Sequence, residues 1–228
     1  MTPRERVLEA LNHREPDRVP IDFGGFDSSS ITGVAYNKLK RHLGISIPTR
    51  LIDPAYQVAK VDEVIVKRFH SDVLPLFYEP KRWRPDMLPD GSPCLVPKNW
   101  TPRTLEDGTR VVYDPKGEIN LKNPRGSHYF DTVYFPLKEA KTIQDIEEGM
   151  EHIYNFDLPS YWDEGFGELN KRSRLLYEKT DYAIMAGFLV HVYMAGQLLR
   201  GFDTFIIDLV YRKELANSIM RKLVDSYK

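Results

Sequence analysis

Three stretches of the chain contain residues of the types that bind ligands or transfer protons in active sites. A glycine turn follows Asp22 and offers backbone amides and serine hydroxyls to a ligand. Glu79 could accept N–H bonds or act as an acid or a base. His191 could bind an anion or carry a proton near neutral pH. The candidate residues are, in chain order, Asp22, Gly24, Gly25, Ser28, Glu79, His191 and Tyr193.

Each candidate also has a purely structural interpretation. The Gly24-Gly25 turn could serve only to reverse the chain, and Glu79 could be a surface carboxylate beside Pro80. A histidine that starts a helix, such as His191, is often satisfied by local hydrogen bonds. The residue types alone therefore leave both interpretations open.

The first 22 residues predict a capped helix followed by a short strand. Thr2 can cap the helix, Glu5 can reach back to the Thr2 amide, and Pro3 occupies the first helical position. The helix is expected to bury Val7, Leu8 and Leu11 and to end near Glu15, because Pro16 follows. Residues 18–22 then indicate a buried strand that runs into the glycine turn.

Two later apolar runs predict buried strands, at 72–78 and 181–190, of the kind found in parallel sheets. Asp53-Pro54 favours a helix start, with Val58, Val61, Ile65 and Phe69 on one face. Ser160 and Asp163 are expected to open a helix with Leu169, Leu176 and Tyr177 inward. Further helices are expected at 34–43, 142–150, 191–200, 203–211 and 213–227.

Residues 80–136 differ in character, because they combine many prolines with turn pairs. Asp90-Gly91, Asp107-Gly108 and the weaker Lys116-Gly117 separate short β-rich runs. We interpret this stretch as a β-hairpin insertion in an α/β framework, since a structureless loop of this length is improbable inside a domain.

Strands that alternate with helices indicate parallel βα units. A (β/α)8 barrel needs eight strands and typically about 250 residues. Only about three such strands are predicted here, so the expected fold class is α/β, with a chain that stops well short of closing such a barrel. We expect a single partial domain over 1–228, either a fragment, a truncated gene product or one half of a split protein. In a TIM barrel, active-site residues lie at the carboxyl ends of strands, where the candidates above fall.

The composition excludes several classes of function. The 32 basic and 33 acidic residues nearly cancel, so no nucleic-acid or membrane-surface partner is indicated. No apolar run approaches the roughly 18 residues of a membrane span, and no signal peptide is visible, so we expect a cytoplasmic protein. Cys94 is the only cysteine, which excludes an internal disulfide or a multi-cysteine metal site.

The literal sequence resembles the uroporphyrinogen decarboxylase superfamily, and within it the branch of corrinoid-dependent methyltransferases and their decarboxylase-like relatives. The match begins with MTPRERVLEALNHREPDRVPID and continues in family order over nearly the whole chain. The other matching segments are 24–25, 28–31, 52–54, 69–73, 135–137, 177–183 and 199–202. The resemblance implies a TIM barrel of which this chain covers the N-terminal part.

The resemblance also implies roles for the candidate residues. The namesake decarboxylases carry an R-Q-A-G-R loop that grips substrate carboxylates, whereas this chain has no arginine at 23–27. Glu79 falls where the decarboxylase has its pyrrole-binding aspartate, and Tyr193 is the nearest counterpart of its active-site tyrosine. The missing arginines argue against decarboxylation of a porphyrinogen with many carboxylates.

The family methyltransferases are expected to hold zinc through a His-x-Cys pair and a later cysteine. No His-x-Cys occurs here, so this chain cannot build that zinc site alone, and the resemblance implies that zinc and a corrinoid are possible in a full-length relative. We expect methyl transfer between a methylcorrinoid, borne by a carrier protein, and a small thiol or folate-type acceptor. The alternatives are decarboxylation of uroporphyrinogen or a related tetrapyrrole acid, and a truncated, non-catalytic paralogue. A homodimer is also possible.

Overall fold

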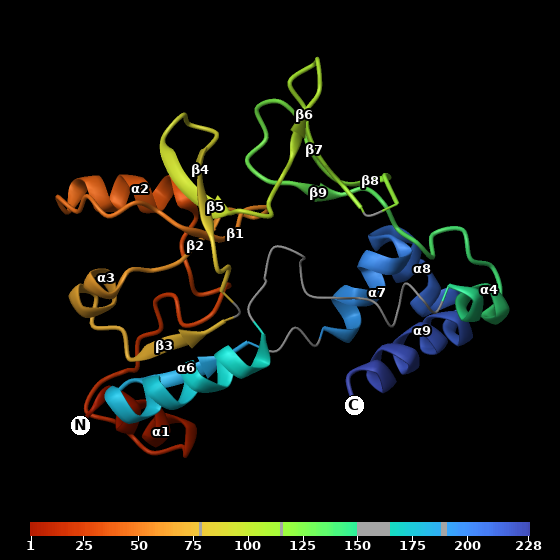
Figure 1. Ribbon diagram of the computed structural model, residues 1–228. Coiled ribbons are helices and arrows are strands. Elements are labelled where there is room, and N and C mark those ends of the chain that lie inside the picture. Colours follow the sequence, from red (N-terminus) through yellow and green to blue (C-terminus); the bar gives the residue numbers. More distant parts are fainter. Residues whose placement is uncertain (78, 115, 150–164, 188–190) are drawn as a thin grey trace. The chain divides into compact units, whose positions relative to one another are not determined.

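The computed structural model describes residues 1–77, 79–114, 116–149, 165–187 and 191–228 (Figure 1). The described residues form two compact units. Unit 1 takes them from Met1–Thr101, Gly126–Tyr129 and Ser160–Gly187. Unit 2 takes them from Pro102–Arg125, Phe130–Pro159 and Phe188–Lys228. The chain is a mixed α/β protein, and no sheet among the residues described closes on itself.

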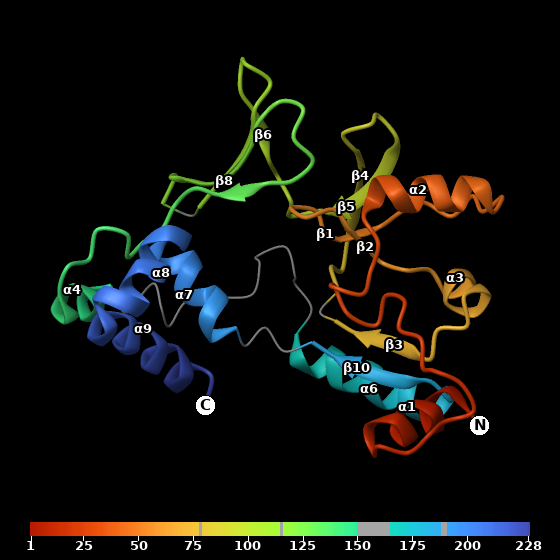
Figure 2. The same ribbon diagram turned by 180° about the vertical axis from the view of Figure 1, so that it is seen from behind.

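Unit 1 contains a parallel pair of strands. Strand β3 (Val73–Leu76) pairs with β10 (Ala183–Ala186), with Val73 opposite Ala183 and Leu76 opposite Ala186. Helix α6 (Phe166–Lys179) precedes β10 and runs along both strands (Figures 1 and 2). Parallel strands need such a crossover connection, so the α/β prediction is confirmed for this pair.

Helix α1 (Pro3–Leu11) has the predicted N-terminus. Thr2 Oγ1 accepts the Glu5 amide, and Glu5 accepts the Thr2 amide at 2.7 Å. The predicted apolar face is wrong, because Leu8 and Leu11 are exposed and the buried residue of the helix is Arg6. Polar contacts hold α1 in place instead. Arg4 donates to the carbonyls of residues 177, 180 and 182, where α6 ends and β10 begins.

The strand predicted at 18–22 is absent, and this segment is not buried. Val19 is 80 % exposed. Pro20 has no N–H to donate, and the Ile21 amide donates to the Asp72 carboxylate at 2.8 Å rather than to a backbone carbonyl. The segment nevertheless lies beside the start of β3, because the Asp72 amide donates to the Ile21 carbonyl at 2.6 Å.

The helix predicted from Asp53-Pro54 is also wrong over its first half. Strands β1 (Leu51–Asp53) and β2 (Val58–Ala59) form a short antiparallel pair, and helix α3 begins only at Glu63 (Glu63–Arg68). The Asp53 carboxylate accepts the amides of Ala55 and Tyr56, which stabilises a turn in place of a helix. Gln57 then adopts a φ of 58°, which a helix does not tolerate.

The β-rich stretch contains the predicted hairpins. In unit 1, β4 (Trp83–Met87) pairs antiparallel with β5 (Pro93–Pro97). In unit 2, β6 (Arg103–Thr104), β7 (Arg110–Tyr113), β8 (Ile119–Asn123) and β9 (Asp131–Thr132) form one antiparallel sheet. Gly91, Gly108 and Gly117 all have positive φ, so the three turn pairs are confirmed at the positions where the chain reverses.

The remaining helices were largely predicted. Unit 1 also has α2 (Gly33–His42), with Gly44 in the left-handed region just after it. Unit 2 has α4 (Ile143–Glu148), α7 (Val192–Arg200), α8 (Phe202–Tyr211) and α9 (Lys213–Ser226). Ser160, Asp163 and the end of the 181–190 run lie outside the described residues. Tyr177 is exposed rather than inward.

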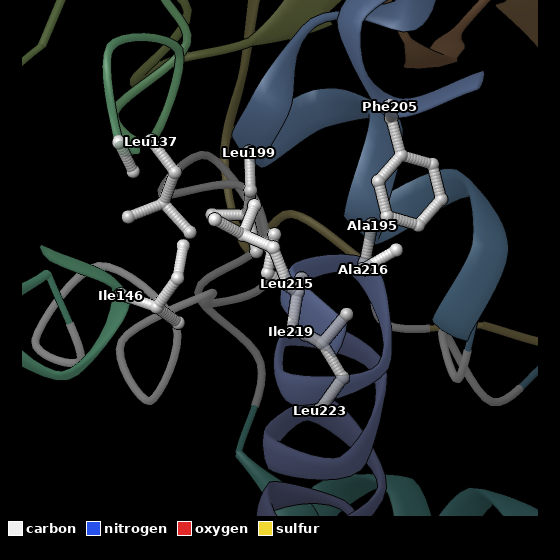
Figure 3. Close-up of a cluster of buried hydrophobic side chains, with 10 residues drawn as sticks. Leu137, Ile146, Ala195, Leu199, Phe205, Leu215, Ala216, Ile219 and Leu223 are labelled. Carbon is white, nitrogen blue, oxygen red and sulfur yellow. The ribbon is translucent and has the colours of Figure 1, made fainter. Parts of the chain in front are cut away.

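The helices of unit 2 pack around one apolar cluster. Figure 3 shows Leu137, Ile146, Leu199 and Phe205 meeting Leu215, Ile219 and Leu223 from α9. Inside unit 2, the buried Arg200 donates to Asp208 Oδ2 at 2.7 Å and to the carbonyls of Leu137 and Lys138. This buried ion pair ties α7 and α8 to the segment that precedes α4. No helix in the described part of the chain is long and apolar enough to cross a membrane.

Candidate functional site

The first group of candidates gathers beyond the carboxyl end of β3. Glu79 Oε2 accepts from Lys60 Nζ at 2.6 Å, and its Oε1 lies 3.3 Å from Arg172 Nη1. Arg172, on α6, also donates to the Phe77 carbonyl and thereby connects the helix to the strand end. We call Lys60, Glu79 and Arg172 the Glu79 cluster. Each of its side chains is about a quarter exposed, so the cluster is accessible to a ligand.

The Gly24-Gly25 turn packs closely against Val61 and Val73 because it lacks side chains. Gly24 has a φ of 87°, and a Cβ there would lie 2.4 Å from Val61 Cγ2. A Cβ on Gly25 would lie 2.4 Å from Asp22 Oδ1 and 2.5 Å from Val73 Cγ1. Only glycine allows this approach, so the turn has a strict structural requirement as well as a candidate binding role.

The amides of the turn are paired within it. The Gly24 amide donates to the Ser29 carbonyl, the Gly25 amide to Asp22 Oδ1 at 2.7 Å, and the Phe26 amide to Ser29 Oγ. Ser28 is exposed, and its amide and hydroxyl both donate to Asp27. In this conformation the turn offers a ligand its exposed hydroxyl and its aromatic side chain rather than a set of open amides.

Phe26 brings the turn to the carboxyl end of the parallel pair. Its ring centroid lies 6.2 Å from that of Phe77, which follows β3. On the other side, a Cβ on Gly187, which follows β10, would lie 2.6 Å from the Phe26 ring. The Phe26 ring therefore lies against the residues that follow both strands, and the glycine turn and the Glu79 cluster belong to one site.

The opposite end of β3 holds a second cluster of charges. The buried Asp72 carboxylate pairs with Arg6 Nη1 at 2.6 Å and with Arg18 Nη1 at 2.7 Å. Asp17 pairs with the same Arg6 at 2.6 Å. We call Arg6, Asp17, Arg18 and Asp72 the Asp72 network. Burial raises the pKa of Asp72, but hydrogen bonds from Arg18, Ile21 and Arg6 outweigh burial and hold that pKa below its usual value.

Two candidates lie in unit 2. His191 is the residue that precedes the first turn of α7, and its side chain makes no capping bond there. Tyr193 is half exposed, and its ring centroid lies 5.9 Å from that of Phe205. The predicted residues thus form one group around Glu79 in unit 1 and a second, His191 with Tyr193, in unit 2.

Sequence reasoning missed Lys60 and Arg172. Lys60 lies 19 residues before its carboxylate and Arg172 lies 93 residues after it, so no local spacing identifies either. One signal was available: a carboxylate at the end of a buried strand needs cationic partners.

The described residues do not fit a zinc site. No group of three or more His, Cys, Asp or Glu side chains comes together within them. Cys94 is buried in β5, where it stands opposite Asp86 of β4.

Comparison with protein-family models, with curated proteins and with solved structures finds no match to this chain.

Proposed function

We propose that this protein is a uroporphyrinogen-decarboxylase-like member of the corrinoid methyltransferase branch. It transfers a methyl group between a methylcorrinoid, borne by a carrier protein, and a small thiol or folate-type acceptor. The observation that carries the proposal is the Glu79 cluster, which lies beyond the carboxyl end of β3 beside the arginine-free glycine turn. The resemblance of residues 1–22 to the superfamily supplies the choice of reaction class.

The arrangement of unit 1 supports a barrel of the TIM type. Strands β3 and β10 are parallel neighbours with α6 against both. The segment from Ile21 to Phe26 lies beside β3: the Ile21 carbonyl accepts the Asp72 amide, and the Phe26 ring lies near that of Phe77. Neighbouring parallel strands with helices outside are the building unit of that fold, and its active sites lie at the carboxyl ends of the strands.

The composition of the turn favours methyl transfer over decarboxylation of a porphyrinogen. A substrate with several carboxylates needs several fixed cations, and arginine is the residue best shaped for them. Residues 23–27 contain none. Lys60 and Arg172 both contact Glu79, so neither replaces a dedicated carboxylate clamp.

The residues of the site suit the chemistry of the acceptor. A methylcorrinoid would supply an electrophilic methyl group and keep the electron pair of the broken cobalt–carbon bond, while the acceptor would lose a proton as it forms its bond to the methyl group. Glu79, held by two cations, is placed to accept the proton or an N–H bond of the acceptor. Phe26 and Phe77, both partly exposed, offer an apolar surface to a flat ring system. In unit 2, His191 is the proposed proton carrier and Tyr193 is the proposed substrate contact.

The test follows the absorbance of methylcob(III)alamin under anaerobic conditions with a panel of thiols and with tetrahydrofolate. The wild type should demethylate the corrinoid with at least one acceptor. The Glu79→Gln variant should lose about 10²-fold or more of that rate, as expected when a general base is removed. Glu106→Gln, which changes an exposed glutamate in the β6–β7 turn, is the matched control and should retain the wild-type rate.

Other outcomes contradict the proposal in distinct ways. Release of CO2 from uroporphyrinogen by the wild type, without demethylation, would favour the decarboxylase. Absence of both reactions would favour the non-catalytic paralogue. A Glu79→Gln variant that demethylates as fast as the wild type would remove Glu79 from the mechanism.

A further inference from the structure

Asp62, two residues after Lys60, lies in a buried polar network in unit 1. Its carboxylate is 5 % exposed and contacts the side chains of three residues. They are the Tyr36 hydroxyl at 2.8 Å, Lys40 Nζ at 3.2 Å and Arg50 Nη2 at 3.3 Å. We call Tyr36, Lys40, Arg50 and Asp62 the Tyr36 network. The proposed reaction uses none of these residues, so the network needs an explanation of its own.

The Tyr36 hydroxyl holds Asp62 at two points. It accepts the Asp62 amide at 2.7 Å and donates to Asp62 Oδ2 at 2.8 Å. Tyr36 is 0 % exposed, and burial raises the pKa of its hydroxyl, so the hydroxyl keeps the proton that it donates. One buried hydroxyl thus fixes both the backbone and the side chain of Asp62.

The three residues from Lys60 to Asp62 connect this network to the candidate site. Lys60 Nζ lies 2.6 Å from Glu79 Oε2. Val61 packs against the glycine turn, because a Cβ on Gly24 would lie 2.4 Å from Val61 Cγ2. Asp62 belongs to the Tyr36 network. Three consecutive residues therefore contact the Glu79 cluster, the glycine turn and the buried network.

Arg50 holds the same segment at two places. Its carbonyl accepts the Lys60 amide at 2.8 Å, and its guanidinium contacts Asp62 Oδ1. The backbone of Lys60 is thus held directly by Arg50 and, through Asp62, by Tyr36. A lysine side chain is flexible and loses much freedom when it enters an ion pair, so a fixed backbone favours the pair with Glu79.

We propose that Tyr36 and Asp62 are positioning residues for the Glu79 cluster. The Tyr36 hydroxyl fixes Asp62, and the fixed backbone places the Lys60 ammonium against the Glu79 carboxylate. Lys60 then keeps Glu79 oriented toward the acceptor. Both positioning residues act through Lys60 and not on the reacting groups. The effect on methyl transfer rests on the proposed function, whereas the placement of Lys60 does not.

The first test measures the placement of Lys60 without the reaction. Brief acylation of the whole protein with limiting acetic anhydride, followed by mass spectrometry of its peptides, gives the modification rate of Lys60. Glu79→Gln should raise that rate about fivefold, because a partly exposed ion pair protects the amine to that extent. Tyr36→Phe, which removes one hydroxyl and keeps the ring, should raise it by a similar factor. Arg50→Met, a milder change at a partly exposed residue, should raise it about twofold.

Thr2→Val is the matched control, because it also removes a hydrogen-bonding hydroxyl from unit 1, but at the cap of α1. Its Lys60 rate should equal that of the wild type. An unchanged rate in the folded variants of the Tyr36 network, or an equal rise in Thr2→Val, overturns the proposal. An unchanged rate in Glu79→Gln overturns it as well, because the ion pair would then not hold Lys60.

The second test measures demethylation of methylcob(III)alamin. Tyr36→Phe should lower kcat about tenfold with an unchanged KM for the acceptor, since it loosens the orientation of Glu79. In a Lys60→Met background, Tyr36→Phe should change kcat by less than about twofold, because the residue through which it acts is gone. Equal losses in the two backgrounds would make Tyr36 a merely structural residue and overturn the proposal. A wild type without demethylation would contradict the proposed function alone, because the acylation rates decide the placement of Lys60.

Discussion

The two ends of β3 carry similar charges in different surroundings. At the amino end, the Asp72 carboxylate pairs with Arg6 and Arg18 and its side chain is 0 % exposed. At the carboxyl end, the Glu79 carboxylate pairs with Lys60 and Arg172, and its side chain is 28 % exposed. A carboxylate held by two cations is thus a structural element when water is excluded and a candidate reagent when a ligand can reach it. Accessibility, more than the pairing itself, separates the two roles.

The largest loss of stability should come from a substitution in the Asp72 network, at the amino end of β3. Asp72→Asn removes the charge that Arg6 and Arg18 both face, and it weakens the bond that holds the Ile21 amide. Removal of one partner from a buried ion pair typically costs about 3–5 kcal/mol of unfolding free energy. Urea denaturation measures this loss. A loss below about 1 kcal/mol would show that the network is not a buried structural element.

A smaller effect is expected at the turn between the two ends. Gly24→Ala combines a φ of 87° with a contact of 2.4 Å to Val61, so it should cost about 2–4 kcal/mol. Gly91→Ala is the matched control, because its φ is 77° but nothing lies within 4 Å of the added Cβ. It should cost about 1–2 kcal/mol. Equal losses in the two variants would contradict the close packing of the Gly24-Gly25 turn against the sheet.

The smallest expected effect is the dependence of stability on pH in the acid range. Hydrogen bonds from Arg6 lower the pKa of Asp17 to about 2, against some burial, and Asp17 is well exposed. A carboxyl with a lowered pKa in the folded state stabilises the protein above its unfolded pKa of about 3.9, and this stabilisation disappears as the pH falls through about 2. The wild type should therefore be more stable than Asp17→Asn at pH 6, and the difference should shrink between pH 4 and pH 2. A difference that grows toward low pH would contradict the pairing.

Local rules predicted the parts of the molecule whose causes are local. The capping box at Thr2 and the turns at Gly91, Gly108 and Gly117 depend on residues within three or four positions. The rules failed where a side chain far away in the sequence took the place of a backbone hydrogen-bond partner. The Asp72 carboxylate, 51 residues away in the sequence, accepts the hydrogen bond of the Ile21 amide, so no strand forms at 18–22.

The same distinction applies to the site. Glu79 could be found from the sequence because it follows a buried strand, and the glycine turn because it follows a recognisable segment. Arg172 reaches Glu79 only when α6 packs on β3, and Lys60 reaches it from the segment between β2 and α3, so no local pattern encodes either contact. The division of the candidates between two units likewise depends on packing and is not visible in the spacing of His191 from Glu79.

The measurement that tests the central claim most directly compares stability and activity in Glu79→Gln. Because Glu79 is partly exposed, its ion pairs should contribute about 0–1 kcal/mol to the unfolding free energy. Methylcob(III)alamin demethylation should nevertheless fall about 10²-fold or more. A variant that loses several kcal/mol of stability while its folded fraction keeps the wild-type rate would contradict the account, because Glu79 would then be the structural carboxylate of the two.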